Sequence, residues 1–250
     1  KYNDTRLMPL DTEKMIKDIY QLANNRDFSN FLASGDDDFS FSLPNIGRFR
    51  VNAYRQRNSC AAVLRIVRFE LPDPKKMHIP EIVCDLANQK KGMILVTGPA
   101  GSGKSTTLAC IIDQINQKRN THIITIEDPI EYLYSHNKSI VSQREVFHDT
   151  KNYVAALKAA LREAPEVILV GEMRDLETID IAITAAETGH LIFSSLHTVG
   201  AANTIDRMID VFPASQQQQI RVQLAMVLNA VICQQLLPGV DGKMIPAFEI

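Results

Sequence analysis

The sequence contains no tryptophan, only four cysteines and no long uninterrupted run of apolar residues. No run reaches the roughly 18–20 apolar residues that a membrane-spanning helix needs, so we expect no direct insertion into a membrane. The cysteines form no CxxC pair, so their spacing predicts neither a zinc ribbon nor a disulfide framework. Reduced thiols in an intracellular protein are therefore expected. The residues concerned are Cys60, Cys84, Cys110 and Cys233.

The sequence also lacks an excess of either charge, with 27 basic and 29 acidic side chains. A nucleic-acid-binding protein usually carries a clustered basic surface, so this balance argues against a nucleic-acid partner. The first residue is Lys1 rather than a methionine, so the absence of a signal peptide says little about the natural N-terminus. With 250 residues, of which 45% are hydrophobic, the chain can build one or two domains.

Residues 1–70 predict a small α+β domain. Apolar residues recur at three- and four-residue spacing between 11 and 34, which predicts a helix. Apolar and polar residues then alternate in segments between 39 and 67 that are separated by short polar turns, the pattern of an antiparallel meander. Pro72, Pro74 and Pro80 follow in a polar stretch, so residues 71–80 are predicted to form a linker.

Residues 81–250 change to a pattern that predicts a parallel sheet covered by helices on both faces. Short apolar runs alternate with helical stretches, and continuously apolar strands are typical of such buried sheets. Segments 130–134 and 140–146 look like a hairpin inserted after the second strand. We expect strands at 93–96, 123–126, 167–170 and 191–193, and helices at 104–117, 152–163, 176–188, 201–211 and 215–231.

The most specific motif joins the first of these strands to its helix. It reads Gly, four residues, Gly-Lys-Ser-Thr, which is the pattern of a phosphate-binding loop. The glycines let backbone N–H groups turn toward a phosphate, and the helix N-terminus adds positive potential. The lysine neutralises the β- and γ-phosphates, and the next hydroxyl binds Mg²⁺. The motif therefore predicts binding of ATP with Mg²⁺ by Gly98, Pro99, Ala100, Gly101, Ser102, Gly103, Lys104, Ser105 and Thr106.

The three other predicted strands each end in a group suited to phosphoryl chemistry. These groups are Glu127, Glu172 and His197. Each of them, taken alone, is also compatible with a solvated carboxylate or a structural histidine. In an open parallel sheet, however, ligands bind beyond the C-terminal ends of the strands. The convergence of all three groups with a phosphate loop on that edge favours nucleotide hydrolysis.

Four segments together resemble the secretion-ATPase superfamily. Residues 98–106, 126–131, 170–175 and 187–198 are similar to its Walker A motif, Asp box, Walker B motif and His box, in the family's order. Segments 48–53 and 161–165 look most like the twitching-motility ATPases that retract type IV pili. The resemblance covers roughly residues 35–250. It implies an α/β fold with a RecA-like P-loop NTPase core and parallel sheet, preceded by a small α+β (PAS-like) domain. It also implies a homohexameric ring in the cytoplasm, which acts on an inner-membrane pilus platform protein.

The same resemblance assigns the phosphate and metal ligands. Lys104, Ser105 and Thr106 correspond to the residues that hold the phosphates and Mg²⁺, and Glu172 to the Walker B carboxylate. Gly171 occupies the place where many P-loop enzymes have an aspartate directed at the metal. We therefore expect Mg²⁺ to be held by Ser105, water and Glu172.

The remaining assignments concern water activation and the response to phosphate. The resemblance gives Glu127 the role of activating water and places His190 and His197 in the His box, although His190 also fits a simple turn cap. Which of the two glutamates polarises the water stays open, and we favour Glu127. Arg50 and Arg65 stand where the superfamily has phosphate-sensing arginines, and exposed residues on a sheet face are the alternative for both.

Three rival functions follow from the same residues. A pilus-assembly or secretion ATPase of the superfamily commonly carries a four-cysteine zinc module after a stretch like 231–237, and here no cysteine follows Cys233. A RecA-like nucleic-acid motor conflicts with the balanced charge. A non-hydrolysing nucleotide switch does not need two glutamates and a histidine at the strand ends. Retraction ATPases continue past the position of Ile250 with a helical region, so we expect this chain to lack that region.

Overall fold

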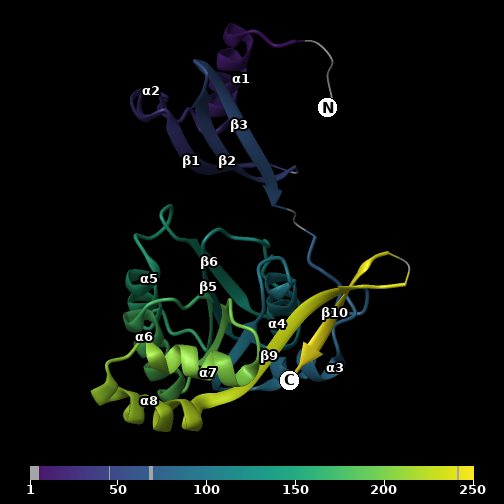
Figure 1. Cartoon of the computed structure of the whole chain (residues 1–250), viewed down its shortest axis with the longest axis vertical. Helices are drawn as coiled ribbons and strands as arrows, with labels where there is room; N and C mark the ends of the chain where they lie inside the picture. The colour runs from purple at the N-terminus through teal and green to yellow at the C-terminus, as the bar shows by residue number, and fades with distance from the viewer. Residues whose placement is uncertain (1–5, 45, 68–69, 241) are drawn as a thin grey trace. The chain divides into compact units, whose positions relative to one another are not determined.

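The computed structural model describes residues 6–44, 46–67, 70–240 and 242–250. The chain divides into two compact units, Lys1–Phe69 and Glu70–Ile250 (Figure 1). Among the described residues, no helix is long and apolar enough to cross a membrane.

The first unit is a three-stranded antiparallel sheet with two helices. Its strands β1 (Asp36–Leu43), β2 (Gly47–Gln56) and β3 (Ser59–Val67) pair in sequence order, which confirms the predicted meander. The single helix expected over 11–34 is wrong, because α1 (Pro9–Leu22) and α2 (Ser29–Ser34) are separate. Asn24 and Asn25 break the helix with φ values of 57° and 54°, a left-handed conformation that asparagine tolerates better than most residues.

The second unit contains a seven-stranded sheet in the order β10-β9-β4-β8-β7-β5-β6. All neighbouring pairs are parallel except β10 with β9, so the predicted α/β fold is confirmed with a mixed rather than purely parallel sheet. The strands are β4 (Gly92–Thr97), β5 (His122–Glu127), β6 (Ile140–Glu145), β7 (Val167–Glu172), β8 (Leu191–Leu196), β9 (Leu228–Pro238) and β10 (Met244–Glu249).

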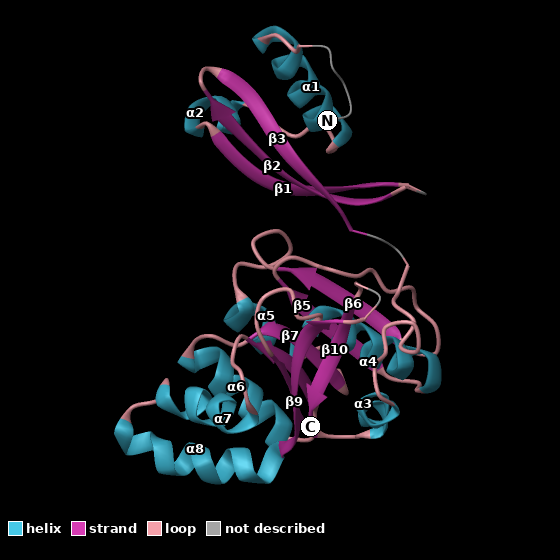
Figure 2. Ribbon diagram, turned by 45° about the vertical axis from the view of Figure 1, so that its right-hand side comes forward, coloured by secondary structure: helices cyan, strands magenta, loops and turns pink. Residues whose placement is uncertain are grey.

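Helices cover both faces of this sheet, as Figure 2 shows. Along β4, Met93 and Leu95 belong to the core on one face, while Ile94 and Val96 belong to the core on the other. This two-sided burial explains why the strands are continuously apolar. The first face is covered by α5 (Tyr153–Ala160), α6 (Leu176–Glu187), α7 (Ala201–Asp210) and α8 (Ala214–Val227). The second is covered by α3 (Glu81–Asp85), the 3₁₀ helix Leu86–Asn88 and α4 (Lys104–Lys118).

The hairpin expected between 130 and 146 is wrong. Residues 130–134 form no strand, and β6 pairs in parallel with β5 at the edge of the sheet. Side chains satisfy the backbone of the connecting segment in place of a strand partner. Ile130 N donates to Glu145 Oε2 at 3.1 Å, and Tyr134 N donates to Gln143 Oε1 at 2.9 Å.

The helix expected over 215–231 is too long, because α8 ends at Val227 and β9 begins with the next residue. Ile220, Leu224, Val227 and Val231 continue the helical spacing of apolar residues across this boundary. From Leu228 on, the chain instead pairs with β4, and Val231 lies opposite Leu95. A tertiary partner thus overrides the local periodicity.

Residues 71–80, predicted as a linker, make contacts within the second unit. The Cys110 thiol donates to the Pro72 carbonyl oxygen at 3.3 Å. Ile79 is buried in the same core cluster as Val83 and Ile111. This segment therefore lies against the helix that follows the phosphate loop.

Candidate functional site: a phosphate loop and the strand ends beside it

The glycine-rich loop connects the end of β4 to the start of α4. Gly103 caps the helix with φ 90°, and Lys104 is its first residue. Lys104 is only 7% exposed, and its Nζ donates to the carbonyl oxygens of Gly98 at 2.9 Å and Pro99 at 2.8 Å. Burial lowers the pKa of this lysine. The ammonium group is thus held inside the loop by main-chain oxygens that a phosphate can replace as its partner.

The residues after Lys104 differ in their environment. Ser105 is exposed at the mouth of the loop, where its hydroxyl is accessible to a ligand. Thr106 is half-buried, and its Oγ1 lies 2.9 Å from the phenolic oxygen of Tyr132. Thr107 is fully buried and donates from Oγ1 to Gln234 Oε1 at 2.7 Å. The first turn of α4 is therefore fixed to two other parts of the chain.

Glu127 ends β5 and is buried. Thr125 Oγ1 donates to its Oε1 at 2.6 Å, and Gln143 Nε2 reaches the same oxygen at 3.4 Å. Burial raises the pKa of the Glu127 carboxyl to about 7, and the hydrogen bonds from Thr125 and Gln143 only partly oppose this shift. A carboxyl group with a pKa near neutral exchanges a proton readily at physiological pH.

Glu172 ends β7 and is more exposed than Glu127. Its Oε2 lies 2.7 Å from Arg174 Nη2 and 3.9 Å from His197 Nε2. The preceding residue, Gly171, is tightly packed, because a Cβ atom there would lie 3.1 Å from both the Ile126 oxygen and the Tyr153 hydroxyl. A side chain at this place, such as the aspartate found in many P-loop enzymes, would require these neighbours to shift.

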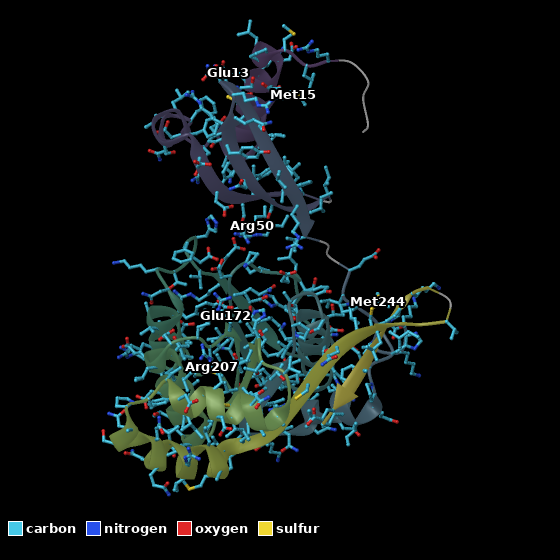
Figure 3. The ribbon with its side chains drawn as sticks, in the orientation of Figure 1. Glu13, Met15, Arg50, Glu172, Arg207 and Met244 are labelled. Atoms are coloured by element: carbon cyan, nitrogen blue, oxygen red, sulfur yellow. The ribbon has the colours of Figure 1, made fainter. Side chains whose placement is uncertain are left out.

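His197 follows β8 and faces a cavity of about 230 Å³ next to Glu172. Burial lowers the pKa of its imidazole, and the positive charges of Lys104 and Arg174 lower it further, while Glu172 opposes them. The neutral imidazole is thereby favoured, and it can accept or donate a hydrogen bond. Arg207 on α7 lines the same cavity (Figure 3).

A second cavity of about 210 Å³ adjoins the end of the loop and the first turn of α4. It is bounded by Gly103, Thr106 and Thr107 of the loop and helix, by residues 76–79, and by β9 and β10. Leu236 and Met244 supply apolar walls, and Gln234 a buried amide. The cavity thus combines apolar surface with one polar side chain beside the first turn of α4.

The structure does not bring His190 to the loop. It precedes β8, at the edge of the sheet opposite the loop, and a six-residue strand separates the two edges by about 20 Å. Its Nδ1 lies 2.9 Å from the Ala185 carbonyl oxygen, and its backbone oxygen accepts from Gly92 N. These contacts fit the alternative role of His190 as a turn cap, and a contact of His190 with the nucleotide stays a prediction.

Arg50 and Arg65 lie in the first unit and are direct partners in the β2–β3 register. Residues opposite each other in an antiparallel pair project from the same face of a sheet. Arg50 also forms an ion pair with Asp38, with Nη2 3.0 Å from Oδ2. The two arginines are thus neighbours on a common face of the first unit.

Four side chains at this sheet edge were not predicted as site residues from the sequence. They are Tyr132, Gln143, Arg174 and Gln234. Arg174 lies within a recognised motif, so its position was a usable signal. Tyr132 lies in a segment that was wrongly predicted as a strand. Gln143 lies on a predicted strand whose pairing was wrong, and Gln234 lies on a strand that was not predicted.

Comparison with known proteins assigns the chain to a family. Residues 22–244 match the family described as Type II/IV secretion system protein. The chain is 46% identical to a type IV pilus retraction ATPase of Pseudomonas aeruginosa over 98% of its own length and 71% of that protein. It is 52% identical to a twitching motility protein of Neisseria gonorrhoeae over 82% of its own length and 55% of that protein.

A solved structure supports the same assignment. The crystal structure of a pilus retraction motor with bound ADP superimposes with a TM-score of 0.91, at 52% identity over 98% of this chain and 70% of that one. The identity is well above the level at which only the fold is shared, and it extends over both units. The chain therefore belongs to the type II/IV secretion system protein family, as an ATPase homologous to the pilus retraction motors.

Proposed function

We propose that the chain hydrolyses ATP with Mg²⁺ and that this hydrolysis drives retraction of a type IV pilus. The observation that carries the proposal is the arrangement at one sheet edge. A phosphate loop with a buried lysine follows β4, and Glu127, Glu172 and His197 follow three further strands at the same edge. Similarity to retraction motors over nearly the whole chain supports pilus retraction over pilus assembly.

Phosphate binding is assigned to the loop from Gly98 to Thr106. Pro99 has no backbone N–H, so the N–H donors of the loop come from its other residues. The last of these residues precede the N-terminus of α4, where anions bind. Lys104 exchanges the Gly98 and Pro99 carbonyls for β- and γ-phosphate oxygens. Burial lowers the pKa of Lys104, and a bound phosphate opposes this shift because its negative charge favours the ammonium form.

The donors near the loop suit Mg²⁺, which prefers oxygen ligands and keeps several waters. Ser105 offers an exposed hydroxyl, and Glu172 a partly exposed carboxylate at the end of β7, which β8 separates from β4. These are the residues that would hold the ion, and bound Mg²⁺ neutralises charge on the phosphates. No group of three or more metal-ligating side chains occurs in the described part of the chain.

Glu127 is proposed to accept the proton of the attacking water. The water oxygen forms a bond to the γ-phosphorus, the bond to ADP breaks, and the proton passes to the carboxylate. With a pKa of about 7, the Glu127 carboxyl is ionised in part of the molecules at neutral pH. Its carboxylate is also a stronger base than one with an ordinary pKa. His197, in its neutral form, is proposed to hydrogen-bond the departing phosphate.

The cavity beside Thr106 is proposed to receive the nucleoside. It adjoins the first turn of α4, and its walls of Leu236 and Met244 suit the apolar face of a base. Residues 76–79 close its other side. Binding there would connect the nucleotide to the segment that leads into the first unit.

Assembly and partners follow from the family resemblance. A homohexameric ring at the cytoplasmic face of the inner membrane, acting on a pilus platform protein, is the proposed setting. The net charge of −2 supports a protein partner over nucleic acid. The alternative is an assembly or secretion ATPase of the same family. A deletion strain separates the two, because loss of a retraction motor leaves excess non-retracting pili and loss of an assembly motor leaves none.

The proposal is tested by phosphate release from Mg²⁺-ATP. The wild-type protein is expected to turn over, and Lys104→Ala is expected to be inactive because the phosphates lose their main positive partner. Equal rates for the two proteins would refute the site. Binding of ATP without any phosphate release would instead favour a nucleotide switch.

A further inference from the structure

Gln234 is a buried polar residue that belongs to none of the recognised motifs. It is 3% exposed and lies on β9. Its Oε1 accepts a hydrogen bond from Thr107 Oγ1 at 2.7 Å, and Thr107 is itself fully buried. A glutamine amide is seldom buried unless its polar atoms are used. The bond therefore connects β9 to the first turn of α4.

The same residue also contacts the two ends of the phosphate loop. A Cβ atom at Gly98 would overlap the main-chain oxygen of Gln234, and one at Gly103 would lie 2.8 Å from its Nε2. Both glycines have positive φ, 143° and 90°, which other residues adopt only with strain. The loop therefore lies against Gln234 at its first and last glycine. Gly98 has no room for a side chain, and a side chain at Gly103 would displace the Gln234 amide.

Strand register explains how Gln234 reaches this place. β9 runs parallel to β4, with Cys233 opposite Thr97. The next residues along the two strands are Gln234 and Gly98, so the sheet itself sets them side by side. The glutamine is thus held by a continuous strand, whereas the loop that it touches has three glycines and little stiffness of its own.

We propose that Gln234 is a positioning residue for nucleotide binding. Resting on the proposed function, this inference gives the glutamine the task of holding Gly98, Gly103 and Thr107 in the geometry that receives the phosphates. A preorganised loop binds more tightly, because less conformational entropy is lost on binding. Removing the Thr107–Gln234 bond should therefore weaken nucleotide affinity and raise KM, while kcat changes little because Gln234 does not reach the reacting atoms.

The experiment measures ADP binding by calorimetry for three variants. Gln234→Met keeps the length of the side chain and removes the amide, and Thr107→Val is isosteric and removes the hydroxyl. We expect each to raise the Kd for ADP about tenfold, which corresponds to about 1.4 kcal/mol. The double variant should be no weaker than either single one, because both changes remove the same bond. Gln235→Ala, one residue along β9 but exposed, is the matched control and should bind ADP like the wild type.

The outcomes separate this inference from the proposed function. Equal ADP affinity of wild type and Lys104→Ala refutes the nucleotide site itself, whatever Gln234→Met does. If Lys104→Ala weakens ADP binding but Gln234→Met binds ADP with wild-type affinity, the positioning role is refuted. It is also refuted if the double variant raises the Kd for ADP about a hundredfold, because the two changes would then act independently. If Gln234→Met does not fold, Thr107→Val decides alone. Melting of each nucleotide-free variant shows whether a loss of affinity is merely a loss of stability.

Discussion

Thr106 Oγ1 lies 2.9 Å from the phenolic oxygen of Tyr132, so the helix that follows the phosphate loop is hydrogen-bonded to the segment that follows Glu127. The carbonyl oxygen of Tyr132 in turn accepts from Gln143 Nε2 at 2.8 Å. Gln143 also reaches Glu127. A short series of contacts therefore connects the loop to the carboxylate proposed as the base.

Tyr132→Phe tests this connection, because it removes the hydroxyl and keeps the ring. One neutral hydrogen bond contributes on the order of 1 kcal/mol, so we expect turnover to fall about two- to tenfold. The measurement is steady-state phosphate release. Tyr54→Phe, in β2 of the first unit, is the control and should leave the rate unchanged. An unchanged rate in Tyr132→Phe would mean that the Thr106 bond has no part in turnover.

Glu127→Gln and Glu172→Gln test the two candidate carboxylates. Each should lower the hydrolysis rate by a factor on the order of 10² or more while ATP still binds, because the amide keeps the shape but neither accepts a proton nor neutralises a metal ion. Rates are measured by phosphate release and binding by calorimetry. If both variants turn over like the wild type, the proposed site is wrong.

The raised pKa of Glu127 predicts how activity depends on pH. Only the ionised carboxylate can accept the proton of water, so kcat should decline as pH falls below about 7, the value to which burial raises this pKa. A pH–rate profile measured between pH 5 and 9 checks the position of this limb. A profile that stays flat down to about pH 5 would exclude Glu127 as the base.

The same group predicts a pH-dependent stability. The folded carboxyl holds its proton up to about pH 7, whereas the unfolded one releases it near 4.5, so ionisation destabilises the fold as pH rises between these values. Glu127→Gln, whose amide oxygen can still accept from Thr125, avoids this cost. Urea unfolding of the nucleotide-free proteins should show the variant more stable at pH 8 by up to about 3 kcal/mol. The difference should vanish near pH 4.5.

Zinc content distinguishes the retraction motor from its assembly relatives. All four cysteines are buried with free thiols, and Cys60 lies in a different unit from the other three. Because no two of them have ligand spacing, we expect purified protein to contain no stoichiometric zinc. Elemental analysis measures this directly. Stoichiometric zinc would revive the assembly-ATPase alternative.

Arg50 and Arg65 are predicted to act on the ATP of their own chain. As register partners they present two positive charges on one face, and an arginine that reaches a departing γ-phosphate accelerates its transfer by roughly 10³–10⁵. Arg65→Ala should therefore be inactive. Mixing it with Lys104→Ala protein, under conditions that let subunits exchange, should restore no activity.

The mixing experiment has a clear alternative outcome. If the arginine served the neighbouring subunit of a head-to-tail ring, about a quarter of randomly mixed sites would combine an intact loop with an intact arginine. Recovered activity would therefore refute action within one chain. An active Arg65→Ala protein on its own would remove the arginine from the mechanism.

The sequence by itself determined the phosphate loop and most of the layered core. Lys104 lies where the motif places it, because a glycine-rich turn between a buried strand and a helix is specified by adjacent residues. Glu127, Glu172 and His197 share an edge because parallel strands bring their C-terminal ends together. Local pattern and topology agree for these elements.

Only the tertiary structure determined how β9 and β6 pair in the sheet. The apolar spacing from Ile220 to Val231 fits a helix throughout, and pairing with β4 alone turns its last part into β9. Likewise, the sequence predicts a strand at 140–146, but only pairing with β5 makes β6 a parallel edge strand instead of half of a hairpin. Gln143 and Gln234 reach the site on these two strands. Contacts between residues distant in sequence, which no local periodicity encodes, therefore placed the side chains that support the loop and Glu127.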